Sequence, residues 1–326
     1  MKPQMNAVVF GFIAALTLAA PAFGADAQAY PHKPIRIIVP FPPGGPSDLQ
    51  ARLLGAKLTE AWGQATIIDN RGGANGIIGI ELAAKADPDG YTPILVTAGF
   101  AVQPSLYPKL PYDPVRDFTL ITRIASGPGI VVVNPSLPVR SVPELIAHAR
   151  AHPGKVFYGS AGNGAPSHLA VELLKVMTRI DAVHVPYKGM AAAINDLVAG
   201  QLQLSIPTMP AGLPLSKAGK LRALAVTGAQ RSPAAPELPT VAEAGVAGYQ
   251  ASNWYGMAAP AKLPRPIIAR LNQELGRIMT APDVREKMLN VGMEPVTSTP
   301  EQFADFMKSE IGKWARVVKT AGVRVD

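Results

Sequence analysis

Residues 41–48 read Phe41-Pro42-Pro43-Gly44-Gly45-Pro46-Ser47-Asp48, and residues 159–168 read Gly159-Ser160-Ala161-Gly162-Asn163-Gly164-Ala165-Pro166-Ser167-His168. Each stretch follows a short apolar run and precedes apolar residues at helical spacing, which predicts a turn from a strand into a helix. Helix starts carry unpaired N–H groups and the positive end of the helix dipole, and glycine lets a ligand approach the backbone closely. The two turns therefore indicate a pair of sites for an anion such as a carboxylate or a phosphate.

Strand and helix patterns alternate around both turns. Around the first turn we expect strands at 35–39, 66–69 and 94–97, with helices after the turn and at 77–86. Around the second turn the expected strands are 130–133, 156–158, 183–185, 202–206 and 221–226, with helices between them. This alternation predicts an α/β fold with parallel or mixed sheets flanked by helices.

Capping patterns place several helix ends. Ser47 with Gln50 and Ser141 with Glu144 match the capping box, and Gly63 is a suitable stop for the first helix. Near the end of the chain, residues 299–302 combine a capping box with a proline at the first helical position.

The helical tail suggests two lobes. Apolar residues at helical spacing mark helices within 267–278 and 303–314, and we expect this tail to return to the first lobe. The crossings between lobes would lie near 125–129 and 248–253, where Trp254 and Tyr255 would pack. The expected division is a first lobe of residues 30–124 and 252–326 and a second lobe of residues 125–251, joined by short hinges.

Residues 1–29 have the pattern of a secretory signal peptide. A basic start precedes an apolar run over 7–20, and small residues follow up to Ala29. The run is short for a membrane span, and no other stretch is long and apolar enough for one, so we expect a soluble mature protein.

Composition excludes several kinds of chemistry. The chain has no cysteine, and therefore no disulfide, thiolate metal site, cysteine nucleophile or lipoprotein anchor. Its net charge is +8, but the basic residues are scattered without interleaved aromatics, which argues against nucleic-acid binding. Neither turn carries the lysine of a phosphate-binding loop or the dinucleotide fingerprint. His148 and His152 have metal-binding spacing without an acidic partner, and we interpret them as surface residues.

The turn residues could also have purely local roles. Ser47 is expected to cap its helix and to contact a ligand as well, whereas Asp48 suits a first helical turn. Ser160 and Ser167 could bond the nearby backbone or a ligand. His168 next to Ser167 could suggest a hydrolase, but no Gly-x-Ser-x-Gly motif is present.

The chain resembles the Bug family of periplasmic solute-binding receptors, which includes the binding proteins of tripartite tricarboxylate transporters. The resemblance covers essentially the whole mature chain. It is carried by the segments 39–48, 70–76, 158–164, 185–189, 219–227 and 239–245.

The resemblance implies a two-lobed, type II-like periplasmic binding protein whose cleft closes on a small carboxylate. One wall would be formed by the first turn and the facing wall by the second, with Ala98, Gly99 and Phe100 bordering the cleft. The expected ligand-binding residues come from these segments and from two later positions. They are Phe41, Pro42, Pro43, Gly44, Gly45, Ser47, Asp48, Ala98, Gly99, Phe100, Ser160, Ala161, Gly162, Asn163, Gly164, Ser167, His168, Tyr187 and Pro207. No catalytic residue, metal or cofactor is implied.

Two departures from the family pattern bear on the ligand. Many relatives carry Phe-Asp where this chain has Ile206-Pro207, so an acid that could hold an ammonium group is missing and an amino acid is disfavoured. Relatives often have serine or asparagine where Gly99-Phe100 stands, and a phenyl ring there would favour an apolar or aromatic carboxylate.

The expected function is a monomeric, non-catalytic periplasmic receptor that binds a mono- or dicarboxylate and presents it to membrane transporter subunits. Two alternatives stay open at this point. One is a soluble subunit that senses a ligand for a sensor kinase, and the other is a secreted hydrolase using His168 or Asp48.

Overall fold

The computed structural model describes residues 30–290 and 292–325. The predicted signal peptide, residues 1–29, lies outside the described residues. No helix within the described part of the chain is long and apolar enough to cross a membrane.

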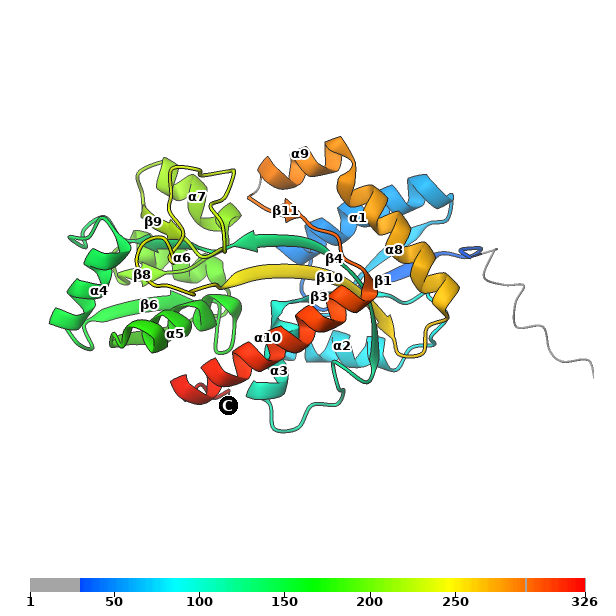
Figure 1. The fold of residues 1–326 in the computed structure, drawn as a ribbon, viewed down its shortest axis with the longest axis horizontal. Coiled ribbons are helices and arrows are strands. Elements are labelled where there is room, and N and C mark those ends of the chain that lie inside the picture. The colour runs from blue at the N-terminus through cyan, green and yellow to red at the C-terminus, as the bar shows by residue number, and fades with distance from the viewer. Residues whose placement is uncertain (1–29, 291, 326) are drawn as a thin grey trace, which may run out of the picture. The chain divides into compact units, whose positions relative to one another are not determined.

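Two mixed β-sheets organise the fold (Figure 1). The first sheet has the strand order β11-β4-β10-β3-β1-β2. Its strands are β1 (Ile35–Val39), β2 (Thr66–Asn70), β3 (Ile94–Thr97), β4 (Phe118–Pro128), β10 (Ser252–Pro260) and β11 (Glu294–Pro295). The helical elements that precede, connect or follow them are α1 (Pro46–Trp62), the 3-10 helix η2 (Ala74–Gly76), α2 (Ile77–Ala84), α3 (Ala98–Leu106), α8 (Arg265–Thr280), α9 (Pro282–Asn290) and α10 (Pro300–Ala321).

The second sheet has the order β7-β6-β8-β5-β9. Its strands are β5 (Ile130–Val133), β6 (Val156–Ser160), β7 (Ala182–Pro186), β8 (Leu204–Ser205) and β9 (Arg222–Val226). They alternate with α4 (Val142–Ala151), α5 (Pro166–Thr178), α6 (Met190–Val198) and α7 (Met209–Lys217). The predicted α/β class with mixed sheets is confirmed.

Strand direction explains where the turns lie. Strand β1 runs parallel to β2 and β3, and β6 runs parallel to β7 and β8. The carboxyl ends of parallel strands share one edge of a sheet, where ligands bind in open α/β folds. The turn after β1 and the turn after β6 are therefore both at ligand-binding edges.

Strands β4 and β10 carry the chain between the sheets. They pair antiparallel from Phe118 with Pro260 to Pro128 with Ser252, and β5 follows β4 after only Gly129. Both sheets belong to one contact unit, Pro31–Asp326. The exact division into lobes at residues 125 and 252 stays a prediction.

Helix α10 packs against the cores of both sheets. Its first half contributes Phe303 and Met307 to a cluster that contains Val96 of β3. Its second half contributes Trp314 to a cluster that contains Val131 of β5. In Figure 1 this red helix extends past α3 toward α5. The helical tail therefore packs on the first sheet, and its last helix also packs on the second sheet.

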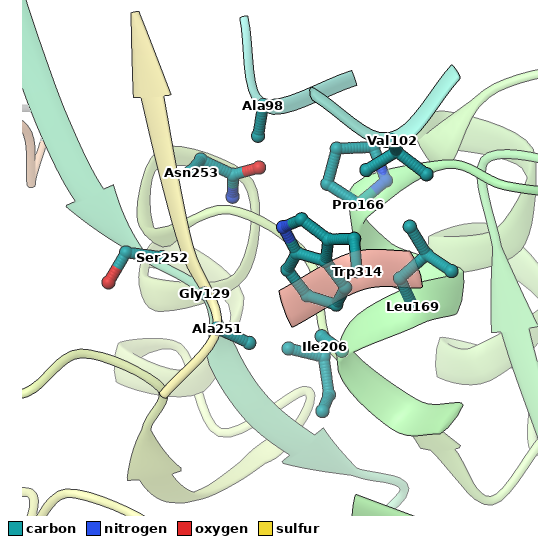
Figure 2. A pocket seen from close by; sticks show the side chains of 11 residues that line it. Ala98, Val102, Gly129, Pro166, Leu169, Ile206, Ala251, Ser252, Asn253 and Trp314 are labelled. Carbon is teal, nitrogen blue, oxygen red and sulfur yellow. The ribbon is translucent and has the colours of Figure 1, made fainter. Parts of the chain in front are cut away.

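A buried carboxylate fixes α10 in this position. Glu310 is 6% exposed, and its Oε2 accepts hydrogen bonds of 3.0 Å from the indole N–H of Trp254 on β10 and from that of Trp314. Lys313 pairs with its other oxygen. The Trp314 ring lies among Pro166, Leu169 and Ile206 around a space of only about 10 Å³ (Figure 2).

Replacing Glu310 with alanine should strongly destabilise the protein. Two buried indole N–H groups would lose their acceptor, and each unsatisfied buried donor costs about 1–3 kcal/mol, so we expect a loss of about 2–6 kcal/mol in the free energy of unfolding. Urea denaturation checks this, with Glu286→Ala on the exposed face of α9 as the matched control. A Glu310→Ala variant as stable as that control would contradict the assigned role.

Candidate functional site

A cavity of about 580 Å³ lies where elements of the two sheets meet. Its lining comes from the turn after β1, from η2 and α3, and from β10 on the side of the first sheet. On the side of the second sheet, the lining comes from the turn before α5, the start of α6 and the segment from β8 into α7. This volume is in the range of small-molecule sites.

The first glycine turn is held by the side chain of Asp48. Its Oδ2 accepts a hydrogen bond of 2.9 Å from the N–H of Gly44 and pairs with Nε of Arg52 at 2.9 Å. Asp48 is 2% exposed, and the hydrogen bonds from Arg52 and Gly44 lower the pKa of its carboxyl. The negative charge of Asp48 is therefore balanced through its Oδ2 by Arg52 of α1, whereas its Oδ1 is buried without a hydrogen-bond partner among the described residues.

The second glycine turn repeats this arrangement with a histidine. Nδ1 of His168 accepts a hydrogen bond of 3.0 Å from the N–H of Gly164, at the same spacing as Asp48 to Gly44. Both glycines have positive φ, +73° for Gly164 and +82° for Gly44, which glycine adopts without strain. A proline then begins each helix, Pro46 in α1 and Pro166 in α5. The two turns are structural equivalents.

The proline changes the expected cap of α1. Pro46 occupies the first helical position, so Gly45 is the N-cap, and it makes no side-chain cap bond. Ser47 lies inside the helix, and the predicted capping box with Gln50 is wrong. By contrast, Gly63 ends α1 in the left-handed conformation, and the predicted caps at Ser141 and Thr299 are confirmed.

Several glycine-turn N–H groups expected to face a ligand are bonded internally. Gly44 and Gly164 donate to Asp48 and His168, Gly162 donates to Oγ of Ser160, and Ala161 donates to Oγ of Ser167. These bonds shape the turns.

The helix starts keep four donors. The intrahelical ladders begin with the N–H of Leu49 and that of Leu169, and neither proline has an N–H. Two residues lie between each proline and its leucine, Ser47 and Asp48 in α1 and Ser167 and His168 in α5. Within the described residues, the N–H groups of these four have no acceptor. Ser47 and Ser167 line the cavity, and helix starts of this kind favour negative charge.

A buried polar network supports the second turn from behind. His168 stacks on His184 of β7 with ring centroids 3.8 Å apart, and Nε2 of His184 lies 2.6 Å from Oγ of Ser160. Glu172 is 5% exposed and accepts from the hydroxyl of Tyr158 at 2.5 Å. Burial lowers the pKa of His168 to about 3 and that of His184 to about 4, so both rings are neutral in the folded protein at pH 7.

The cavity wall is apolar and carries no formal charge. Among the described lining residues there is no Asp, Glu, Lys, Arg or His. Its lining includes large apolar side chains such as Phe41, Leu106, Met190, Ile206 and Trp254. No group of three potential metal ligands occurs within residues 30–290 and 292–325. An anion here would be held by hydrogen bonds and helix dipoles.

Seven of the sequence-predicted residues line the cavity: Phe41, Pro42, Ser47, Gly99, Ala161, Gly164 and Ser167. Those outside its lining are Pro43, Gly44, Gly45, Asp48, Ala98, Phe100, Ser160, Gly162, Asn163, His168, Tyr187 and Pro207. Asp48, Ser160, Gly162 and His168 shape the turns, as described above. Ala98 lines the small space beside Trp314 instead (Figure 2).

Two aromatic residues of the expected site lie outside the lining. Phe100 is 1% exposed and packs against Tyr112 and Phe118 in the core, so its ring does not border the cavity. Tyr187 donates a hydrogen bond of 2.6 Å to Asp196, which raises the pKa of its hydroxyl to about 12, and it also lies outside the lining.

Sequence reasoning missed a further group of lining residues. Asn75 on η2, Gln103 on α3 and Tyr107 just after it reach the cavity, as do Trp254 and Tyr255, for which packing was the main expectation. The glycine-rich segment 70–76 follows β2, whose carboxyl end lies beside that of β1. This position was a usable signal for Asn75.

Acidification should destabilise the protein through the two buried histidines. In the unfolded state each histidine binds a proton as the pH falls through about 6.5. In the folded state the lowered pKa values of His168 and His184 keep both rings neutral until the pH falls to about 4. Their contribution to stability is therefore present above pH 6.5 and lost as the pH falls toward 4. Each histidine adds a slope of at most about 1.4 kcal/mol per pH unit.

Urea unfolding at several pH values between 7 and 4.5 measures this slope. His168→Asn and His184→Asn should each flatten it, whereas the exposed His32→Asn should keep the wild-type slope. Equal slopes in all four proteins would contradict the analysis.

Comparison with known proteins identifies relatives along nearly the full chain. Residues 50–323 match the family model described as "Tripartite tricarboxylate transporter family receptor". Protein BugT of Bordetella pertussis is 38% identical over 324 residues, which cover 99% of this chain and 98% of BugT.

Solved structures agree with this relationship. The R. palustris protein Rpa4515 with adipate is 40% identical, with a TM-score of 0.82 over 90% of this chain and 99% of that one. MatC of Rhodopseudomonas palustris with bound malate is 31% identical, with a TM-score of 0.78 over 89% of this chain and 100% of MatC. The periplasmic binding protein BugD is 34% identical, with a TM-score of 0.79 over 90% of this chain and 99% of BugD. The chain belongs to the tripartite tricarboxylate transporter receptor family, with the fold of its periplasmic solute-binding proteins.

Proposed function

We propose that this protein is a periplasmic receptor that captures a mono- or dicarboxylate, aromatic ones included, and delivers it to a tripartite tricarboxylate-type transporter. The observation that carries the proposal is the pair of equivalent helix starts at α1 and α5, whose first residues with an N–H group, Ser47 and Ser167, line one uncharged cavity. Family membership and the adipate and malate named for two relatives support the ligand class.

The available donors are sufficient for useful affinity. Each hydrogen bond to a charged group contributes about 1.5–3 kcal/mol, and four of them can supply the roughly 8 kcal/mol of micromolar binding after part of the gain is lost to ordering. The dipoles of α1 and α5 both favour negative charge at this position. Neither a metal nor a cofactor enters this scheme.

The lining also restricts the rest of the ligand. Since no described lining residue is acidic, a ligand ammonium group would be desolvated without a counter-charge. Ile206, next to the Pro207 that replaces the acid of many relatives, contributes to the apolar part of the lining. An amino acid is therefore disfavoured, and an apolar or aromatic remainder fits.

Capture includes closure of two lobes. The first lobe is residues 30–124 with 252–326, and the second is residues 125–251. The receptor acts as a monomer without catalysis.

The pair of Ser160 and His184 has the distance of a nucleophile and its base, but Ser160 is 0% exposed and is bonded within the turn. A substrate could not reach its hydroxyl. This burial argues against the hydrolase alternative.

Calorimetry with a panel of mono- and dicarboxylates tests the function. We expect at least one member to bind with micromolar or tighter affinity, and Ser47→Ala, which removes a cavity hydroxyl, to weaken it about two- to tenfold. Ser216→Ala, at the C-terminal end of α7, is the remote control. Tight binding of sugars or cations with no binding of any carboxylate would refute the proposal.

Gly164→Ala should weaken carboxylate binding by at least about tenfold, or 1.4 kcal/mol. A Cβ at residue 164 would lie 2.2 Å from Cδ1 of Leu106, at a φ of +73° that alanine rarely adopts. The added methyl group would therefore push the second turn away from α3.

Gly248→Ala is the matched control for backbone strain, because its φ is +79° and its Cβ would meet nothing within 4 Å. That variant should bind as wild type, and the double variant with Leu106→Ala should recover part of the loss. Unchanged affinity in Gly164→Ala would show that crowding between the new methyl group and Leu106 does not affect carboxylate binding, and would contradict the prediction.

A further inference from the structure

A chain of hydrogen bonds leads from the core of the first sheet to the cavity wall. The hydroxyl of Tyr112 donates to Oε1 of Gln103, and Nε2 of Gln103 donates to the backbone oxygen of Asn75 at 2.8 Å. Nδ2 of Asn75 then donates to the hydroxyl oxygen of Tyr107 at 2.7 Å. Tyr112 and Gln103 are 5% and 4% exposed, so this series of hydrogen bonds begins at buried side chains.

The last pair in this series of hydrogen bonds, Asn75 and Tyr107, retains an unused donor. Because the Tyr107 oxygen accepts from Asn75, its own O–H proton is left to donate, and no acceptor for it is recorded within the described residues. With the Asn75 amide turned over, Tyr107 would donate to the amide oxygen, and the amide N–H groups would be unused instead. In either arrangement the pair offers a donor where both residues line the cavity.

The surroundings make this donor selective. Tyr107 follows Leu106, and other large lining residues such as Met190, Ile206 and Trp254 are apolar. A ligand oxygen that the proposed closure of the lobes buries there without a donor would cost about 1–3 kcal/mol. The Tyr107 donor belongs to a different wall element from the helix starts that would hold the first carboxylate.

We propose that Tyr107, positioned by Asn75, is a specificity-determining residue that donates a hydrogen bond to a second oxygen acceptor of the ligand. The protein would then prefer carboxylates with a second carboxylate or carbonyl oxygen over plain monocarboxylates of the same length. This inference rests on the proposed function and names the part of the ligand remote from its first carboxylate.

Tyr107→Phe removes only the hydroxyl and is the direct test. Calorimetry should compare adipate with hexanoate, and malate with butanoate, in wild type and variant. We expect wild type to bind at least one dicarboxylate about tenfold or more tightly than its monocarboxylate partner. The variant should lose about tenfold for that dicarboxylate and less than twofold for the monocarboxylate.

Two further variants separate positioning from general damage. Asn75→Ala should reduce the same preference, and combining it with Tyr107→Phe should add nothing further, because both act through one donor. Tyr91→Phe is the control, since its hydroxyl bonds His32 away from the cavity and its loss should leave both affinities unchanged.

The outcomes distinguish the inference from the proposed function. If no carboxylate binds wild type, the proposed function fails and this inference falls with it. If carboxylates bind but wild type shows no preference, or Tyr107→Phe weakens both ligand series equally or neither, only the inference is overturned.

Discussion

The site depends on one repeated hydrogen bond, from the N–H of a left-handed glycine to the side chain four residues later. Asp48 makes it to Gly44 and His168 makes it to Gly164. Each bond folds the turn back on the first helical turn, while the following proline begins the helix without an N–H of its own. Within the described residues the next two N–H groups have no acceptor, and in the proposed function they would bind an anion. Chemically different side chains, a carboxylate and a neutral imidazole, serve the same purpose because both are acceptors.

The difference between those side chains has an electrostatic reason. Asp48 lies near a position that favours negative charge, and Arg52 compensates it directly. On the other side, burial keeps His168 and His184 neutral, so the second turn adds no charge. The charge of a bound carboxylate would then be balanced mainly by peptide dipoles, which are fixed by the backbone and need little rearrangement. Helix α10 holds the surrounding elements together, since Glu310 links Trp254 on β10 to Trp314, which packs beside α5.

Much of the fold could be predicted because short buried strands and amphipathic helices leave direct patterns. Strands β1, β3 and β5 have the predicted bounds, and α10 begins at its capping box. Helix α3 was missed because it contains Gly99 and Pro104 and begins without a side-chain cap bond, so packing against α10 rather than propensity supports it. Strand β10 was missed because it is almost continuously buried and interrupted by Gly256, which removes the alternation typical of a strand.

The sequence by itself determined the α/β class, the two glycine turns, their position before helices and the family resemblance, because these depend on local patterns and glycine chemistry. Only the tertiary structure decided which N–H groups remain free, because side chains such as Ser167 and His168 take up others through bonds that spacing does not reveal. It also placed Phe100 in the core and Tyr107 on the cavity wall. The direction of a side chain depends on how its helix packs against distant strands, and a local pattern carries no record of that packing.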